Sequence, residues 1–143
     1  MGVQQLNRRL VLRAIAERLD EQVSWATVSL GERTSDPPTI VVHAIDGGAD
    51  AALLQRPGRA GDVALQLTCV AGPDEQAGID QVEELAWTAV DALRGWRDDD
   101  AGIVRVHQET RGDARRDYEE RPAVWFATPT LTVTVDQSRQ EQP

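Results

Sequence analysis

The stretch DVALQLTCVAGPDEQAGIDQVEELAWTAVDAL, residues 62–93, decides the fold because its apolar pattern changes period once, at Gly72-Pro73. Before this break, apolar and polar residues alternate, and one face of the segment carries Val63, Leu65, Leu67 and Cys69. Such alternation predicts a half-buried strand over 63–70. After the break, Gly72 can cap a helix that Pro73 begins, and apolar residues recur at helical spacing through residue 93. We therefore expect a strand that leads directly into a long amphipathic helix.

The segments on either side of this stretch complete a single domain. Apolar spacing predicts another helix over 3–19, and β-branched runs bounded by turn residues predict strands over 24–30, 39–45, 103–110 and 123–135. Pro129 divides the last run, which implies one strand or two, with an edge or a bulge there. Two helices can cover only one face of such a sheet. We expect an α+β, two-layer fold, with a mixed or antiparallel sheet of four to five strands and two helices on one face, over residues 1–135. A flexible polar tail is expected over 136–143.

The composition disfavours nucleic acids and membranes as partners of this chain, because it is acidic and has no long apolar run. The formal net charge is −9, and all fifteen basic residues are arginine. An acidic balance argues against a surface that grips nucleic acid, which needs clustered positive charge. The first residues lack the apolar core of a signal peptide, and no apolar run approaches the ~20 residues that span a bilayer. These features predict a soluble protein that is made in a cytoplasm and does not enter a membrane.

Cys69 is the only cysteine and the first candidate for chemistry. A thiolate nucleophile can be activated by the start of a following helix and by a histidine, here His43 or His107. Against this enzyme interpretation, Cys69 shares its strand face with apolar residues and is expected in the core. The two histidines match no metal motif, and Asp98–Asp100 lacks the spacing of a calcium loop, so a solvated turn explains it better. We expect no catalytic site, no metal and no cofactor.

Two other features suggest contacts between subunits. Trp87 lies on the helix row that also holds Glu83, Asp91 and Arg94, away from the main apolar stripe. A large aromatic side chain among charges is typical of an interface anchor, and boundary packing under a loop is the alternative. The second feature is the long Gly-rich connection over 46–61, in which Leu53 and Leu54 are apolar and Arg56 and Arg59 are basic. A connection of this length is usually functional or mobile, and we expect these residues to contact a neighbouring chain. The alternative is that Leu53 and Leu54 fold back on the sheet.

Three segments in this order resemble the tail terminator proteins of long-tailed phages with non-contractile tails, particularly phages of GC-rich actinobacteria. They are LQLTCVAGPDEQAGIDQVEELAWTAVDAL at 65–93, IVVHAIDGG at 40–48 with the loop that follows, and YEERPAVWFATPTLTVTV at 118–135. The likeness spans about residues 1–135. The helix of this family carries an Asp-Arg pair near its end, whereas here Asp91 and Arg94 are separated by two residues.

The resemblance implies a structural virion protein without catalytic activity. It implies a homohexameric ring that terminates the tail tube and joins the tail to the head, with the major tail tube protein and a head-completion or connector protein as partners. Six copies would carry a formal charge of −54, six times −9, so that DNA could pass through the lumen without binding. Another head-tail connector, neck or tail-completion protein is the nearest alternative, and a small cytoplasmic enzyme that uses Cys69 is a distant one.

Overall fold

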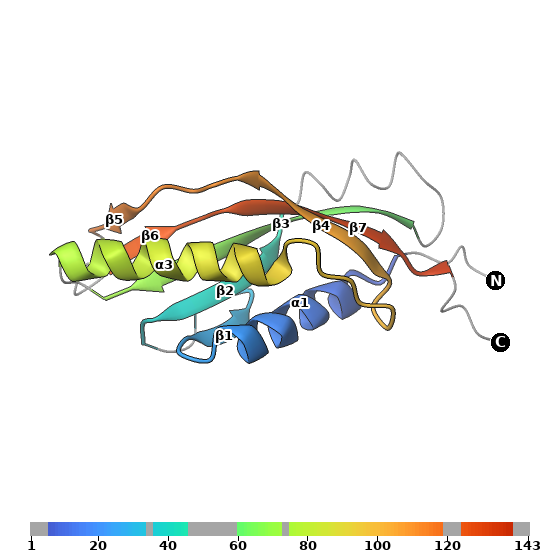
Figure 1. Ribbon diagram of the computed structural model, residues 1–143, viewed down its shortest axis with the longest axis horizontal. Coiled ribbons are helices and arrows are strands. Elements are labelled where there is room, and N and C mark those ends of the chain that lie inside the picture. The colour runs from blue at the N-terminus through green and yellow to red at the C-terminus, as the bar shows by residue number, and fades with distance from the viewer. Residues whose placement is uncertain (1–5, 34–35, 46–59, 73–74, 119–123, 139–143) are drawn as a thin grey trace.

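A computed structural model describes residues 6–33, 36–45, 60–72, 75–118 and 124–138, and it confirms the expected α+β class with a mixed sheet (Figure 1). Its elements, in chain order, are α1 (Arg8–Gln22), β1 (Thr27–Leu30), β2 (Thr39–Ala44), β3 (Ala60–Ala71), α3 (Glu75–Leu93), β4 (Ile103–Thr110), β5 (Arg115–Asp117), β6 (Val124–Ala127) and β7 (Thr130–Asp136).

The long strand β3 lies in the middle of the sheet. On one side it pairs antiparallel with β2, which pairs in turn with β1 in parallel. On its other side, the first part of β3 pairs with β7 and the last part with β6, both antiparallel. Strand β4 continues the sheet beyond β7, and β5 continues it beyond β6.

The sheet has seven strands instead of the expected four to five, because two of its rows are divided. Strands β6 and β7 form one row that breaks at Thr128-Pro129, and β4 and β5 form the next row, which breaks over 111–114. The expected interruption at Pro129 is confirmed, but it lies in the interior of the sheet and not at an edge. Gly112 lies in the break between β4 and β5, where it adopts φ +72°. Its backbone packs against that of Thr128 and Pro129 in the break of the neighbouring row, an approach that a side chain would obstruct.

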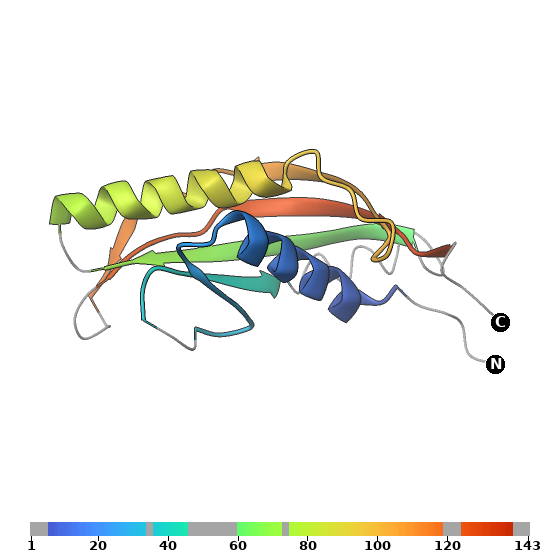
Figure 2. The ribbon, with the colours of Figure 1, turned by 60° about the horizontal axis from the view of Figure 1, so that its bottom comes forward.

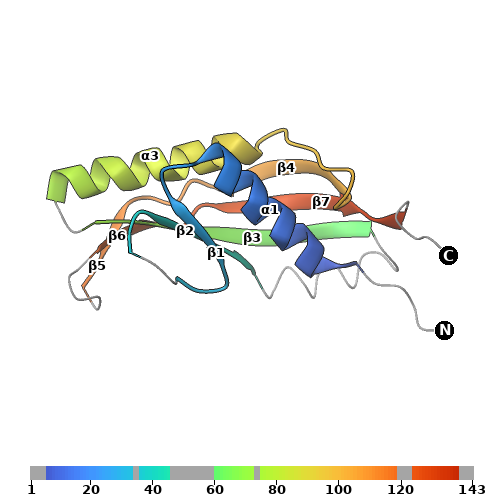
Figure 3. The same cartoon turned by 90° about the horizontal axis from the view of Figure 1, so that it is seen from below.

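Both helices lie on the same face of the sheet. Helix α1 packs on β1 and β2, α3 packs on β3, β4 and β6, and the helices touch each other (Figures 2 and 3). The core between these layers includes Val11, Ile15, Leu19, Ile40, Leu65, Leu67, Val82, Leu85, Leu93, Leu131 and Val133. Arg18 also links the two helices, since its Nε donates to the carbonyl oxygen of Ala92 at 3.0 Å.

Buried Gln137 joins the start of α1 to the end of β7. The backbone N–H of Asn7 donates to Gln137 Oε1 at 2.6 Å, and Gln137 Nε2 donates to the carbonyl oxygens of Asn7 and Ala101. Asn7 also caps α1, because its Oδ1 accepts a hydrogen bond from the N–H of Leu10. The helix therefore begins at Arg8, later than the expected residue 3, and ends at Gln22. The ordered domain also extends beyond the predicted boundary at residue 135, since Gln137 is part of it.

Helix α3 passes so close to β6 that only glycine fits at position 78. A Cβ atom built on Gly78 would overlap the indole ring of Trp125 and lie 2.6 Å from the carbonyl oxygen of Gly72. The absence of a side chain at this point allows Trp125 to pack between the helix and the sheet.

We predict that Gly78→Ala destabilises the protein, although alanine is the better helix former by about 1 kcal/mol. The added methyl group must displace Trp125 or the backbone at Gly72, and such overpacking lowers the free energy of unfolding by about 1–3 kcal/mol. Guanidinium denaturation measures the change. Gly72→Ala is the matched control, because its added Cβ meets no atom within 4 Å. A more stable Gly78→Ala variant would contradict the close packing.

Candidate interaction surface

The structure separates Cys69 from both histidines. Cys69 is fully buried on the helix-covered face of β3, and its burial raises the pKa of the thiol to about 12. His43 pairs in register with Gln66 and hydrogen-bonds to Thr68, which places it on the opposite, helix-free face. His107 is in register with Thr132 on the same helix-free face. The expected core position of Cys69 is confirmed, and neither histidine is placed to act as its base.

We predict that Cys69 resists alkylation in the native protein. Iodoacetamide reacts with the thiolate, and burial removes both the thiolate and the access that the reagent needs. At pH 8 the rate of modification, measured by mass spectrometry, is expected to be at least ~100-fold lower than in the same protein unfolded in guanidinium. Rapid and selective labelling of the native chain would favour the enzyme alternative.

The helix-free face carries its own polar contacts in the middle of the sheet. His43 Nε2 lies 3.1 Å from Thr68 Oγ1 and 3.2 Å from Gln66 Nε2. Glu109 Oε1 accepts from the Thr132 hydroxyl at 2.8 Å and lies 2.8 Å from His107 Nε2. These two contacts, first that with Thr132, lower the pKa of Glu109. Several side chains of this face thus bond to one another, although His107 Nδ1 is buried without a partner among the described residues.

At one end of the same face lies an apolar hollow of about 380 Å³. Its floor is formed by Val41, Val70, Val124 and Phe126, and residues Gly31 to Arg33 line one side. Val41 and Val70 are buried although they lie on the face without helices. The hollow is therefore the one part of this face, among the described residues, where buried apolar side chains gather away from the main core.

The outer face of α3 presents the aromatic residue that the sequence singled out. Trp87 is 60% exposed, and the guanidinium carbon of Arg94 lies 5.7 Å from the centre of its ring. Arg94 Nη2 also donates to Gln108 Oε1 on β4 at 3.1 Å. Asp91 is exposed and makes no hydrogen bond or ion pair with a residue that the structure describes. The structure thus brings Trp87 and Arg94 together and leaves Asp91 apart from them.

Trp87 stands at the rim of a hollow of about 450 Å³ between α3 and the bend that joins β4 to β5. Its lining includes Ile79, Glu83, Ala86, Gln108, Arg111 and Trp125. Trp125 Nε1 is buried and has no hydrogen-bond partner among the described residues.

The sheet ends in two open edges. Among the described strands, β1 pairs only with β2, and the outer row of β4 and β5 pairs only with β7 and β6. An unpaired edge can add a strand from another chain unless charges or irregularities prevent it. Strand β4 has both, since Arg105 and Glu109 lie on it and its register shifts near each end. The edge at β4 is therefore protected against the addition of a strand. The outer face of α3 has no such protection and is the more accessible surface for another chain.

Sequence reasoning missed a second exposed aromatic residue, Trp25. It was placed inside a predicted strand over 24–30, but β1 begins only at Thr27, and Trp25 lies in the turn after α1. It is 42% exposed and lines a hollow of about 530 Å³ with Ala77, Asp80, Gln81 and Glu84 of α3. Strand alternation offered a signal, because it would place Trp25 on the same side as the polar residues Thr27 and Ser29.

The remaining predicted contact residues lie in the connection between β2 and β3. Leu53, Leu54, Arg56 and Arg59 lie outside the described residues. No group of three His, Cys, Asp or Glu side chains in the described part of the chain is placed to hold a metal ion. Neither α1 nor α3 has the length and apolar character that a membrane-spanning helix needs. Asp98 forms the expected turn before β4, where its Oδ1 accepts from the N–H groups of Asp100 and Ala101.

Fold and surface together define an α+β domain with one helix-covered face, two open edges among the described strands and exposed tryptophans on the helix side. No model of a known protein family matches the chain, and no curated protein is significantly similar to it.

Proposed function

We propose that this chain is a structural phage protein that assembles with copies of itself into the ring that terminates the tail tube and joins the tail to the head. The proposal starts from the resemblance of its segments to tail terminator proteins. The observation that carries it is the outer face of α3, where Trp87 is 60% exposed beside Arg94. An exposed tryptophan with a stacked arginine is typical of the residues that anchor protein interfaces.

A ring requires two different surfaces on each subunit, because every copy contacts one neighbour with each of them. The one-sided helix layer supplies such surfaces. The face of α3 that bears Trp87 lies on one side, and the edge strand β1, which pairs only with β2 among the described strands, lies at a border of the sheet. This arrangement supports assembly of identical copies more readily than it supports a self-contained pocket.

The acidic charge is compatible with a channel for DNA. Acidic side chains that line a lumen repel phosphates, so that DNA passes without specific binding. The proposed partners are therefore the neighbouring copies, the major tail tube protein at one rim of the ring and a head-completion or connector protein at the other. The proposed location is the tail or neck of the virion, and host cytoplasm during assembly. No catalytic activity is part of the proposal.

Light scattering and negative-stain electron microscopy test the proposal directly. The purified chain is studied alone and after mixing with tubes of the tail tube protein encoded beside it. We expect rings, with six times the 15.7 kDa subunit mass for a hexamer, and tubes capped at one end. A chain that stays monomeric alone and leaves tube ends bare would contradict the proposal. Rings that bind a head connector but never a tube would favour the alternative neck protein.

We predict that Trp87→Ala weakens ring formation much more than it weakens the fold. Loss of an interface anchor costs about 2 kcal/mol or more, which raises the concentration needed for assembly by about 30-fold. The free energy of unfolding of the monomer should change by less than about 0.5 kcal/mol, because the side chain is largely exposed. Light scattering over a dilution series measures assembly, and chemical denaturation measures the fold.

Trp87→Tyr is the matched control for this change. It retains an aromatic ring over which Arg94 can stack, so assembly should lie between that of the wild type and Trp87→Ala. If Trp87→Ala reduced monomer stability and left assembly unchanged, Trp87 would be a packing residue only.

A further inference from the structure

The charges of α1 are arranged against its helix dipole. The first half of the helix exposes Arg9 and Arg13, and the second half exposes Glu17, Asp20 and Glu21. Its first turn has no acidic residue and its last turn has no basic residue. A helix dipole favours acids near the start and bases near the end, so this order opposes the stability of the isolated subunit. The start of α1 is therefore basic and its end is acidic.

The basic end has no partner within the described subunit. Arg9 and Arg13 are exposed and lie one helical turn apart. Neither makes a hydrogen bond, an ion pair or a ring contact with a residue that the structure describes. Two neighbouring guanidinium groups are therefore available to another chain.

The hollow beside Trp25 has the opposite character. It lies between Trp25 and the first half of α3, and Asp80 and Glu84, one helical turn apart, line it. Asp80 Oδ1 accepts only from Gln76 Nε2, at 3.0 Å, and Glu84 has no partner among the described residues. We call Trp25, Asp80 and Glu84 the acidic hollow.

Each of the other three tryptophans has an arginine over its ring, whereas Trp25 in the acidic hollow has none among the described residues. A guanidinium lies 5.6 Å from the ring centre of Trp96, 5.7 Å from that of Trp87 and 5.3 Å from that of Trp125. No described arginine lies over Trp25, although the residue is 42% exposed. A guanidinium group can stack on an aromatic ring while its N–H groups bond to carboxylates, and the acidic hollow offers both.

We propose that the acidic hollow of one copy receives Arg9 and Arg13 from α1 of a second copy. The arginines of the same chain cannot fill it, because Arg9 lies about 20 Å from the end of α1 and Trp25 follows that end. One end of the subunit thus complements the other, which is the head-to-tail contact that a closed ring repeats. The inference rests on the proposed ring and specifies which surfaces meet in it.

Charge reversal on either side of this contact provides the test. Variant A is Arg9→Glu with Arg13→Glu, and variant B is Asp80→Arg with Glu84→Arg. Each places like charges together, so the concentration needed for assembly should rise by more than about 100-fold. Variant B retains its basic helix end and variant A retains its acidic hollow. In an equimolar mixture, the acidic helix end of variant A also meets the basic hollow of variant B. Opposite charges then face each other at both junctions, so rings of alternating copies should form again, and light scattering measures their recovery.

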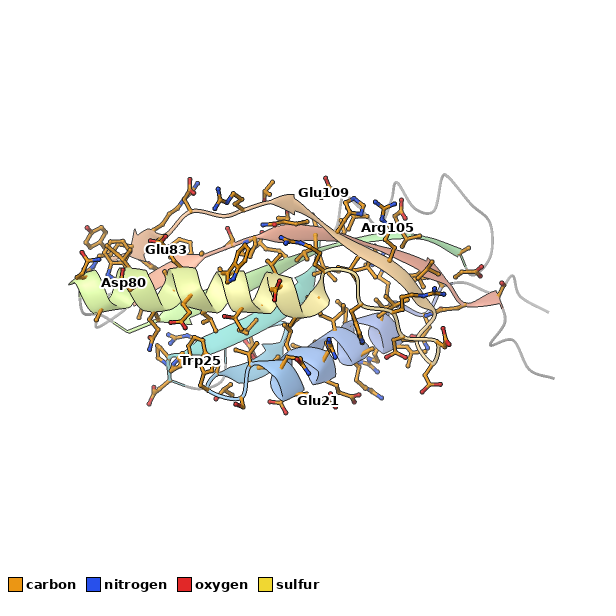
Figure 4. The ribbon with its side chains drawn as sticks, in the orientation of Figure 1. Glu21, Trp25, Asp80, Glu83, Arg105 and Glu109 are labelled. Carbon is orange, nitrogen blue, oxygen red and sulfur yellow. The ribbon has the colours of Figure 1, made fainter. Side chains whose placement is uncertain are left out.

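Matched controls separate this contact from general effects of charge. Arg105→Glu makes the same charge change on the edge strand β4, outside both surfaces, and should assemble like the wild type (Figure 4). Trp25→Ala should weaken assembly while circular dichroism shows an unchanged fold. Assembly of the wild type should also weaken between about 50 mM and 500 mM NaCl, because exposed charges are screened.

The outcomes distinguish this contact from the proposed function. Wild-type rings that persist in variants A and B, or a mixture of A and B that stays monomeric while the wild type forms rings, would overturn the contact and leave the ring proposal standing. If variant B forms normal rings but loses binding to tail tubes, the hollow receives another protein and not a second copy. A wild-type chain that forms no ring alone or with tubes would overturn both proposals.

Discussion

Strand β3 is the element on which the rest of the structure depends. It is hydrogen-bonded along both edges, to β2 on one side and to β7 and β6 on the other. Its alternation places Val63, Leu65, Leu67 and Cys69 against the helices. A shift of register by one residue would turn this entire row to the helix-free face, so the position of every other strand follows from it.

Because both helices lie on one face of the sheet, the helix-free face and the outer side of the helices differ in the side chains that they expose. On the helix-free face several polar side chains bond to one another, as the contacts of His43 with Thr68 and of Glu109 with Thr132 illustrate. The helix-covered side instead exposes two tryptophans, and its charged residues Arg9, Arg13 and Glu84 lack partners among the described residues. Polar groups that bond to one another gain little from a further partner, whereas an exposed ring beside unpaired charges gains both burial and pairing. For this reason we assign contacts between copies to the helix side.

Local pattern predicted the elements of this fold better than their ends. Strand β4 has the expected bounds, because its apolar alternation lies between clear turns. The start of α1 was predicted too early, because a long-range contact decides it: buried Gln137, 130 residues away, binds the backbone of Asn7. The sequence predicted an edge or a bulge at Pro129. No local signal could show that the neighbouring row is also interrupted there, at Gly112, which packs against Pro129. Of the predicted contact residues, the pattern found exposed Trp87 but missed Trp25, whose hollow exists only where the end of α1 meets α3.

Trp87 and Trp25 show why residue type alone could not identify a surface for assembly. Both are exposed, but Arg94, from the turn directly after α3, lies over the ring of Trp87, while Trp25 lies beside two carboxylates and has no described arginine over it. A covered ring has already gained its cation within the subunit, so a partner adds mainly apolar burial there. The ring of Trp25 has no described cation over it, and Arg9 and Arg13 near the start of α1 have no partner among the described residues. Because the helix holds these groups apart within one subunit, only a second molecule can bring them together.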